Sequence, residues 1–365
     1  MTDFYATVFG AGPSGLSIAN ALSKKGKSVL LIDPYVSENA PGAPAGLVNP
    51  ATGRRAKLSW RSRECFDTLN RHLDELEQFA GNNEEQPIIS RSGVIRPAIN
   101  EKLADNFLES LEKYDWPKGW IRWMKRDEVT ACNPEIAPNH GALYLNNGFT
   151  VFADRYLNTY RKFLRNKGVE CRYEEASYQF NENSRTFSIS IQEEHYSTEH
   201  IIIAAGFNAP SFKDWDYLPL HLVKGQIVHF EADEDLSWHH AVSSMGYALR
   251  RGKRELVVGS TYEHKFEGLN TTDDAYQRIA DKLANMLPNI SKRVKKIGQV
   301  AGIRVTTPNK LPVIGRHREI DNLCIYTAMG SKGLLFSEYT ASLLADHLAD
   351  NTAMPDELGT DRFHK

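Results

Sequence analysis

The sequence predicts an α/β fold, with a Rossmann-like domain built from discontinuous segments and a mixed-sheet α+β domain inserted between them. Three observations support this class. Residues 4–34 read as strand, glycine turn, helix and strand. Residues 201–204 and 325–328 are continuous apolar strands, which are typical of parallel sheets buried on both faces. Residues 218–259 alternate between apolar and polar, as strands of a mixed sheet do.

The first βαβ unit carries a glycine pattern typical of dinucleotide binding. Its three glycines form GxGxxG between the first strand and its helix. The first allows a tight turn, the second lets the backbone approach a pyrophosphate, and the third allows close helix–strand packing. An acid ends the next strand, where a carboxylate accepts hydrogen bonds from ribose hydroxyls. An ordinary βαβ turn is the alternative. The predicted cofactor contacts here are Gly10, Gly12, Pro13, Ser14, Gly15 and Asp33.

The sequence contains one such unit, which favours FAD over NAD. A flavoprotein that also takes electrons from a nicotinamide usually carries a second one. The stretch "GAPAGLVNPATG", residues 42–53, contains glycines, but no strand precedes it and proline interrupts the expected helix. We therefore expect one tightly held FAD rather than an exchangeable NAD.

The other elements follow in an order that divides the chain. We expect helices at 62–79, 101–113, 154–167, 273–286 and 333–349, the third with Asp154 as its N-cap. Strands are expected at 92–99, 169–180 and 187–192. The resulting prediction is an FAD-binding domain formed by residues 1–88, 145–215 and 298–365. The substrate domain is formed by residues 89–144 and 216–297.

Composition and charge bear on whether the protein binds nucleic acid, spans a membrane, forms disulfides or holds a metal. The formal net charge is −2, so nothing in the total favours nucleic acid, although a local basic patch is compatible with it. No apolar run approaches the roughly 18 residues of a membrane span, and the start lacks a secretory signal, so a cytoplasmic location is expected. The four cysteines are far apart, which predicts free thiols. The histidines are scattered, and we expect no metal site.

Seven motifs in one order resemble the D-amino acid oxidase family of FAD-dependent amine oxidoreductases. The layout is most similar to that of glycine oxidases, and "GSKGL" is similar to the FAD oxidase domain of the bifunctional enzymes that modify tRNA wobble uridine. The resemblance covers nearly the whole chain. The motifs are "VFGAGPSGLSIANAL", "LVNPATGRR", "IIIAAGFNAPSF", "LPLHLVKGQIVHF", "GYALRRGKRELVVGST", "VAGIRVTTPNKLPVIGR" and "YTAMGSKGLLFSEYTASLLADHL".

The resemblance implies noncovalent FAD and oxidation of a C–N bond next to a carboxylate. It implies that Arg304 binds the substrate carboxylate, that Tyr247 lines the substrate pocket, and that Lys332 stands where glycine oxidases have a basic residue near the last helix. Those three are the predicted catalytic residues. The further cofactor contacts that it implies are Gly46, Leu47, Val48, Ser177, Ala205, Gly206, Arg304, Gly330, Ser331, Lys332, Gly333 and Leu334.

Each of these side chains also has a structural explanation. A guanidinium fits a carboxylate with two parallel N–H groups, so Arg304 could bind substrate or form an internal ion pair with an Asp. Tyr247 could donate its hydroxyl to the same carboxylate or pack in the core. Lys332 could help the glycine turn stabilise negative charge on reduced flavin, or be a solvated loop lysine.

The predicted reaction is hydride transfer from the substrate α-carbon to flavin N5, followed by hydrolysis of the imine. Reoxidation by O2 or by another acceptor is equally compatible with the sequence. Two alternatives stay open. One is oxidation of a carboxymethylaminomethyl group on tRNA, for which "GRRAKLSWRSR", residues 53–63, could contact phosphates. The other is a catalytically inactive flavin-binding protein.

The sequence also departs from the glycine oxidase pattern. Met245 stands where glycine oxidases place a polar residue near the substrate, and Arg54, Arg55 and Lys57 replace mostly small residues. Cys324 falls inside a buried strand, so we interpret it as a core residue and not as a flavin attachment point.

Overall fold

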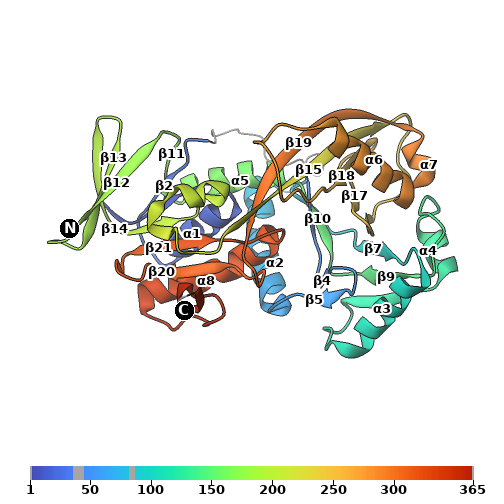
Figure 1. Cartoon of the computed structure of the whole chain (residues 1–365), viewed down its shortest axis with the longest axis horizontal. Coiled ribbons are helices and arrows are strands. Elements are labelled where there is room, and N and C mark those ends of the chain that lie inside the picture. Colours follow the sequence, from blue (N-terminus) through green and yellow to red (C-terminus); the bar gives the residue numbers. More distant parts are fainter. Residues whose placement is uncertain (1, 36–44, 82–86, 364–365) are drawn as a thin grey trace.

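The computed structural model describes residues 2–35, 45–81 and 87–363, and two large sheets dominate it (Figure 1). In the first sheet, β1, β2, β11, β14 and β21 run parallel, while β12, β13 and β20 extend it antiparallel. This confirms the predicted α/β class. Its strands are β1 (Phe4–Phe9), β2 (Val29–Ile32), β11 (Glu170–Arg172), β12 (Ala176–Asn181), β13 (Thr186–Ile191), β14 (Glu194–Ile203), β20 (Val313–Arg316) and β21 (Leu323–Thr327).

Helices cover one face of this sheet because alternate strand residues present apolar side chains to them. Val8, Ile202 and Tyr326 lie in one buried cluster with side chains from the four helices on this face, which are α1, α2, α5 and α8. The other face packs against the β12–β13 hairpin and two short 3-10 turns, η1 (Gly206–Ser211) and η2 (Lys213–Trp215). The four helices are α1 (Pro13–Lys24), α2 (Ser62–Ala80), α5 (Ala153–Asn166) and α8 (Gly333–Asp350).

The second sheet is mixed, as predicted, because β16 and β7 pair in parallel and its other strands pair antiparallel. Figure 1 shows its long strands β15 and β19 running toward the first sheet. Its order is β19 (Val294–Thr306), β15 (His221–Ala232), β18 (Glu255–Gly259), β17 (Tyr247–Arg250), β16 (Ala241–Ser243), β7 (Val94–Pro97), β9 (Ala142–Leu145) and β8 (Ile121–Met124).

Small elements complete the described fold. The helices beside the second sheet are α3 (Glu101–Lys113), α4 (Arg126–Cys132), α6 (Asp273–Met286) and α7 (Pro288–Ser291), and η3 (Thr360–Phe363) lies near the C-terminus. Two small sheets contain β3 (Gly46–Val48), β10 (Phe149–Val151) and β6 (Ile89–Ser90), and the hairpin of β4 (Ala51–Thr52) with β5 (Lys57–Leu58).

The N-terminal cap of α5 differs from its prediction. The N-cap of α5 is Phe152, not Asp154, which lies in the first turn of the helix. The Asp154 carboxylate instead accepts the Arg155 N–H and forms an ion pair with Arg251, in the turn between β17 and β18 of the second sheet. That partner comes from a distant part of the chain, so local sequence could not reveal it. The domain limits remain a prediction, and β19 crosses the limit expected between residues 297 and 298.

The described ranges contain neither a membrane-spanning helix nor a cluster of metal ligands. None of the helices in residues 2–35, 45–81 and 87–363 is long and apolar enough to cross a membrane. Within the same ranges, no three His, Cys, Asp or Glu side chains come together as a metal site would require. The four cysteines are free thiols.

Candidate flavin and carboxylate site

The glycine turn before α1 has two glycines that the chain itself requires and one that it does not. Gly10 has φ +112°, and a side chain there would collide with the Ala204 carbonyl. A side chain at Gly15 would collide with the Gly10 carbonyl. A Cβ added to Gly12, in contrast, would meet no heavy atom of the described residues within 4 Å. Gly12 therefore borders open space, as a pyrophosphate site requires.

The start of α1 is available to an anion. Gly12 is its N-cap and Pro13 follows at the first helical position, while no side chain among the described residues caps the helix. The first amide groups of such a helix carry partial positive charge and lack intrahelical acceptors. The predicted contacts Pro13 and Ser14 belong to this turn, so the residues present fit the pyrophosphate of FAD.

Asp33 is held against the same turn. One carboxylate oxygen accepts the Ala11 N–H at 2.8 Å and the other accepts the Tyr35 N–H at 2.9 Å. The Asp33 N–H donates to the Arg172 carbonyl at 3.0 Å, so the end of β11 lies beside it. Sequence reasoning missed this neighbour. Ser177, the contact predicted from that region, is exposed on β12 and pairs with Ser190 of the hairpin.

A second glycine turn links α8 to the strand that carries Arg304. Gly330 has φ +58°, and its N–H donates to the Val305 carbonyl at 2.8 Å. At the start of α8, Leu334 lies against Gly46 of β3, where an added Cβ would be only 2.7 Å from its Cδ1. The predicted flavin contacts in β3 and in residues 330–334 therefore lie together, beside the end of β19.

A buried polar cluster joins α1 to α8. Glu338 of α8 accepts the Ser17 hydroxyl at 2.5 Å and the Tyr160 hydroxyl at 2.9 Å. His72 of α2 lies 3.5 Å from the same carboxylate oxygen. Burial raises the pKa of Tyr160 well above its ordinary value, and the Glu338 charge acts in the same direction. The cluster fixes the two helices whose N-terminal turns carry most of the predicted cofactor contacts.

Arg304 projects from β19 into a half-buried polar site. Its Nη2 donates to the Ser260 hydroxyl at 2.8 Å and its Nη1 to the Thr261 carbonyl at 3.3 Å. Gly225 makes room for the guanidinium, because a side chain there would collide with it. The guanidinium also lies over the Tyr262 ring, 4.6 Å from the centroid. No carboxylate of the described residues forms an ion pair with it, so the alternative of an internal Arg–Asp pair finds no partner there.

Tyr247 lies in β17 of the second sheet, close enough to Arg304 for the guanidinium charge to act on its hydroxyl. It pairs with Gly259 across β17 and β18, and its hydroxyl packs over that glycine. Burial raises the pKa of Tyr247 to about 12, while the Arg304 charge acts in the opposite direction. The phenol is therefore a neutral hydrogen-bond donor at physiological pH, close to the guanidinium.

Lys332 has different neighbours. It is the N-cap of α8, and its ammonium lies over the Phe336 ring, 5.1 Å from the centroid. Burial lowers the pKa of Lys332, with the Cys65 thiol opposing this and Lys310 adding to it. Lys332 is thus half-buried rather than a solvated loop residue, but its described contacts do not include Arg304.

The other predicted contacts lie around these two turns. Ala205 and Gly206 follow β14, directly after Ala204, which backs the first glycine turn. Leu47 and Val48 lie in β3 beside β10, and Ser331 is exposed between Gly330 and Lys332.

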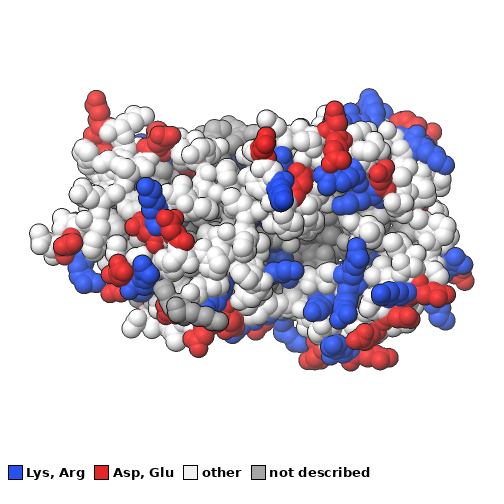
Figure 2. All heavy atoms as spheres, viewed as in Figure 1, with Lys and Arg blue, Asp and Glu red and all other residues white. Residues whose placement is uncertain are grey.

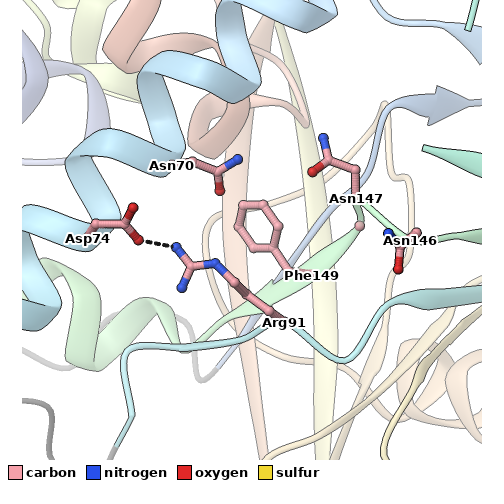
Figure 3. Close-up of a pocket in the computed structure, with 7 residues that line it drawn as sticks. Asn70, Asp74, Arg91, Asn146, Asn147 and Phe149 are labelled. Carbon is pink, nitrogen blue, oxygen red and sulfur yellow. Dashed lines mark hydrogen bonds and ion pairs between the residues drawn. The ribbon is translucent and has the colours of Figure 1, made fainter. Parts of the chain in front are cut away.

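A pocket of about 200 Å³ lies elsewhere and contains none of the predicted residues (Figure 3). Arg91 forms an ion pair with Asp74 at its edge, at 2.6 Å. The lining residues are Asn70, Asp74, Arg91, Asn146, Asn147, Gly148 and Phe149. A larger pocket of about 560 Å³ is lined by Leu222 and by residues 264–267. Leu222 pairs with Val305 of β19 and Val223 with Arg304, so Leu222 lies on the opposite face of the sheet from Arg304.

The chain is similar in sequence and in fold to FAD-dependent oxidoreductases. The family model described as DAO, FAD dependent oxidoreductase, matches residues 6–347. The glycine oxidase of Pseudomonas aeruginosa is 23% identical over 362 residues, which cover 96% of each chain. The tRNA 5-methylaminomethyl-2-thiouridine biosynthesis bifunctional protein MnmC of Thiobacillus denitrificans is 25% identical over 359 residues, or 95% of this chain, which spans 56% of that relative. The glycine oxidase structure from Geobacillus kaustophilus has a TM-score of 0.81 at 20% identity, covering 97% of this chain and 96% of that one.

Proposed function

The chain belongs to the DAO family of FAD-dependent oxidoreductases, and from this premise we propose that it oxidises the C–N bond of a small amine or amino acid that bears a carboxylate. The observation that carries the proposal is Arg304. Its guanidinium is half-buried, is held by the neutral groups of Ser260 and Thr261, and has no carboxylate partner among the described residues. A half-buried guanidinium of this kind is stabilised by an anion, which the substrate would supply.

In this proposal, one set of residues binds the cofactor and another binds the substrate. The turn at Gly12 would hold the pyrophosphate of FAD, and residues 330–334 would contact its flavin. FAD, when bound, supplies a two-electron acceptor. Arg304 binds the substrate carboxylate and Tyr247 donates its hydroxyl to the same group, which orients the α-carbon. Such alignment contributes up to about 7–11 kcal/mol to catalysis.

The proposed oxidation of the C–N bond needs no acid–base triad. The substrate must carry a neutral amine, whose nitrogen lone pair forms the C=N bond as the α-hydrogen leaves with two electrons. Water then adds to the imine and releases a carbonyl compound and an amine. O2 or another acceptor takes the two electrons.

The test is an anaerobic panel in which the FAD-loaded protein is mixed with glycine, sarcosine, proline and D-amino acids. We expect at least one of them to bleach the yellow flavin colour, because reduction removes it. The measurement is the visible absorption of flavin over time. If every member of the panel leaves the colour unchanged, the small-substrate proposal is wrong.

A second candidate is oxidation of a modified uridine in tRNA, and one surface feature favours it. The β4–β5 hairpin exposes Arg54, Arg55 and Lys57, and no ion pair joins them to a carboxylate of the described residues. Figure 2 shows Lys and Arg side chains over this part of the molecule. Backbone phosphates are the anions that such a basic hairpin fits.

The matched variant for this candidate replaces Arg54, Arg55 and Lys57 with alanine together. If tRNA is the substrate, retention of the protein on tRNA should fall steeply with salt, and the triple variant should show a flatter salt dependence, because fewer counterions are released. Binding measured across a salt series checks this. Retention that the triple substitution does not change would exclude the hairpin as the tRNA contact.

A further inference from the structure

Tyr262 is an aromatic side chain beside Arg304 that no sequence motif predicted as part of the site. It directly follows Ser260 and Thr261, the two residues that accept hydrogen bonds from the guanidinium. The guanidinium lies over its ring, 4.6 Å from the centroid. The side chain is 61% exposed, and none of the buried apolar clusters in the described part of the chain includes it. Core packing therefore does not explain where this ring lies.

The backbone of Tyr262 is fixed although its side chain is exposed. On one side of it, the Thr261 N–H donates to the Gln226 carbonyl at 3.1 Å. On the other side, Glu263 and Lys224 exchange two backbone hydrogen bonds, at 2.9 and 3.0 Å. These bonds join the residues after β18 to β15, so the exposed ring projects from an ordered strand pair.

Tyr262 lies on the face of the second sheet that carries the Arg304 guanidinium. Thr261 donates its hydroxyl to the Glu263 carboxylate at 2.5 Å, so these two side chains share one face. Because side chains alternate along a strand, Tyr262, which stands between them, points to the other face. Gly225 of β15 exposes its backbone on that other face, since an added Cβ there would collide with the Arg304 guanidinium.

The guanidinium is therefore held by uncharged surfaces. A Cβ added to Gly225 would be about equally close to its Cζ, Nη1 and Nη2, so the Gly225 backbone lies against the flat face of the group. Tyr262 supplies a second flat surface, and the face of an aromatic ring attracts a cation. A guanidinium has five N–H groups, of which Ser260 and Thr261 accept two. The contacts with Gly225 and Tyr262 leave the other N–H groups for an anion.

We propose that Tyr262 is a positioning residue for the substrate carboxylate and that it acts through Arg304. This rests on the proposed function of the site. A carboxylate pairs with two parallel N–H groups when it lies in the plane of the guanidinium. The Tyr262 ring fixes that plane before the ligand arrives, so binding does not have to order a long, flexible side chain. Tyr262 thus raises the affinity for a carboxylate without contacting it.

The experiment measures the binding of an inert carboxylate, so that it does not depend on turnover. Methoxyacetate carries one carboxylate and has no C–N bond to oxidise. It is titrated into the FAD-loaded protein while the visible flavin spectrum is followed. We expect Tyr262→Leu to weaken its binding about three- to tenfold, because leucine covers the guanidinium without an aromatic face. Tyr262→Phe keeps that face and should bind within about twofold of the wild type.

A double-mutant cycle shows whether Tyr262 acts through Arg304. In an Arg304→Met background the ring has no guanidinium to orient, so adding Tyr262→Leu should change methoxyacetate binding by less than about twofold. Tyr276→Leu is the matched control. Lys296 of β19 lies over the Tyr276 ring, 4.7 Å from the centroid, so this variant removes a similar contact elsewhere. It should leave binding within about twofold of the wild type. Flavin content and thermal unfolding of each variant report on folding.

Three outcomes overturn the inference. Tyr262→Leu could bind methoxyacetate as tightly as the wild type. It could weaken binding by the same factor with and without the Arg304 guanidinium, which would mean that the ring acts on the ligand or on the fold. Tyr262→Phe could be as weak as Tyr262→Leu, which would assign the effect to the hydroxyl. In all three, Arg304→Met alone still weakens binding. Failure of the proposed function differs, because Arg304→Met would then bind methoxyacetate as the wild type does, and both proposals would be wrong.

Discussion

Arg304→Met should leave FAD bound and weaken carboxylate ligands by about 30-fold or more, since removing one member of a desolvated charge pair costs about 2–5 kcal/mol. Methionine preserves much of the side-chain volume beside Gly225 but offers no N–H group. The Ser260 hydroxyl and the Thr261 carbonyl would each lose a donor, and because both residues are buried, part of the cost falls on the stability of the protein. Titration with methoxyacetate, followed by the flavin spectrum, measures the loss.

Arg304→Lys separates charge from geometry. A lysine retains the positive charge but not the planar pair of donors, so it should recover part of the affinity only. Tyr247→Phe provides a second comparison, because it removes a neutral donor and should cost less than Arg304→Met. If Arg304→Met bound carboxylates as tightly as the wild type, the role assigned to the guanidinium would be wrong.

The sequence predicted the parts of the molecule that depend on local pattern. The strand–glycine–helix–strand unit, the buried parallel strands and the mixed second sheet each have a periodicity that the chain displays directly. The reasons given for Gly10 and Gly15 also agree with the structure, because a glycine turn and close packing are local requirements.

Features that depend on distant partners were not predictable in this way. Asp154 forms an ion pair with Arg251, from the turn between β17 and β18, and does not cap its own helix. The carbonyl of Arg172 lies beside Asp33 because β11 pairs with β2, whereas Ser177, which the family resemblance implied, lies on β12. Lys282 reaches Ser260 from a surface helix, and a lysine in an amphipathic helix is ordinarily a solvated residue.

A side chain added at Gly12 meets no described atom, whereas one added at Gly15 collides with the backbone, and this difference gives a direct test of the cofactor site. Gly12→Val should produce a folded but colourless protein. The backbone at Gly12 has φ −79° and ψ −175°, which is extended and suits a β-branched residue, and an added Cβ meets no described heavy atom within 4 Å. Among the described residues an added Cβ displaces nothing, whereas a pyrophosphate must approach this backbone closely. Flavin content after purification and after reconstitution with FAD measures the effect.

Gly15→Val is the matched control, because its side chain would collide with the Gly10 carbonyl inside the protein. It should lower the stability of the apoprotein as well as its flavin content, whereas Gly12→Val should leave apoprotein unfolding close to that of wild-type apoprotein. Thermal unfolding of both variants without FAD distinguishes the two effects. Full flavin occupancy in Gly12→Val would show that no pyrophosphate lies at this turn. A Gly12→Val apoprotein as unstable as Gly15→Val would show that Gly12, too, is required by the chain and not by the ligand.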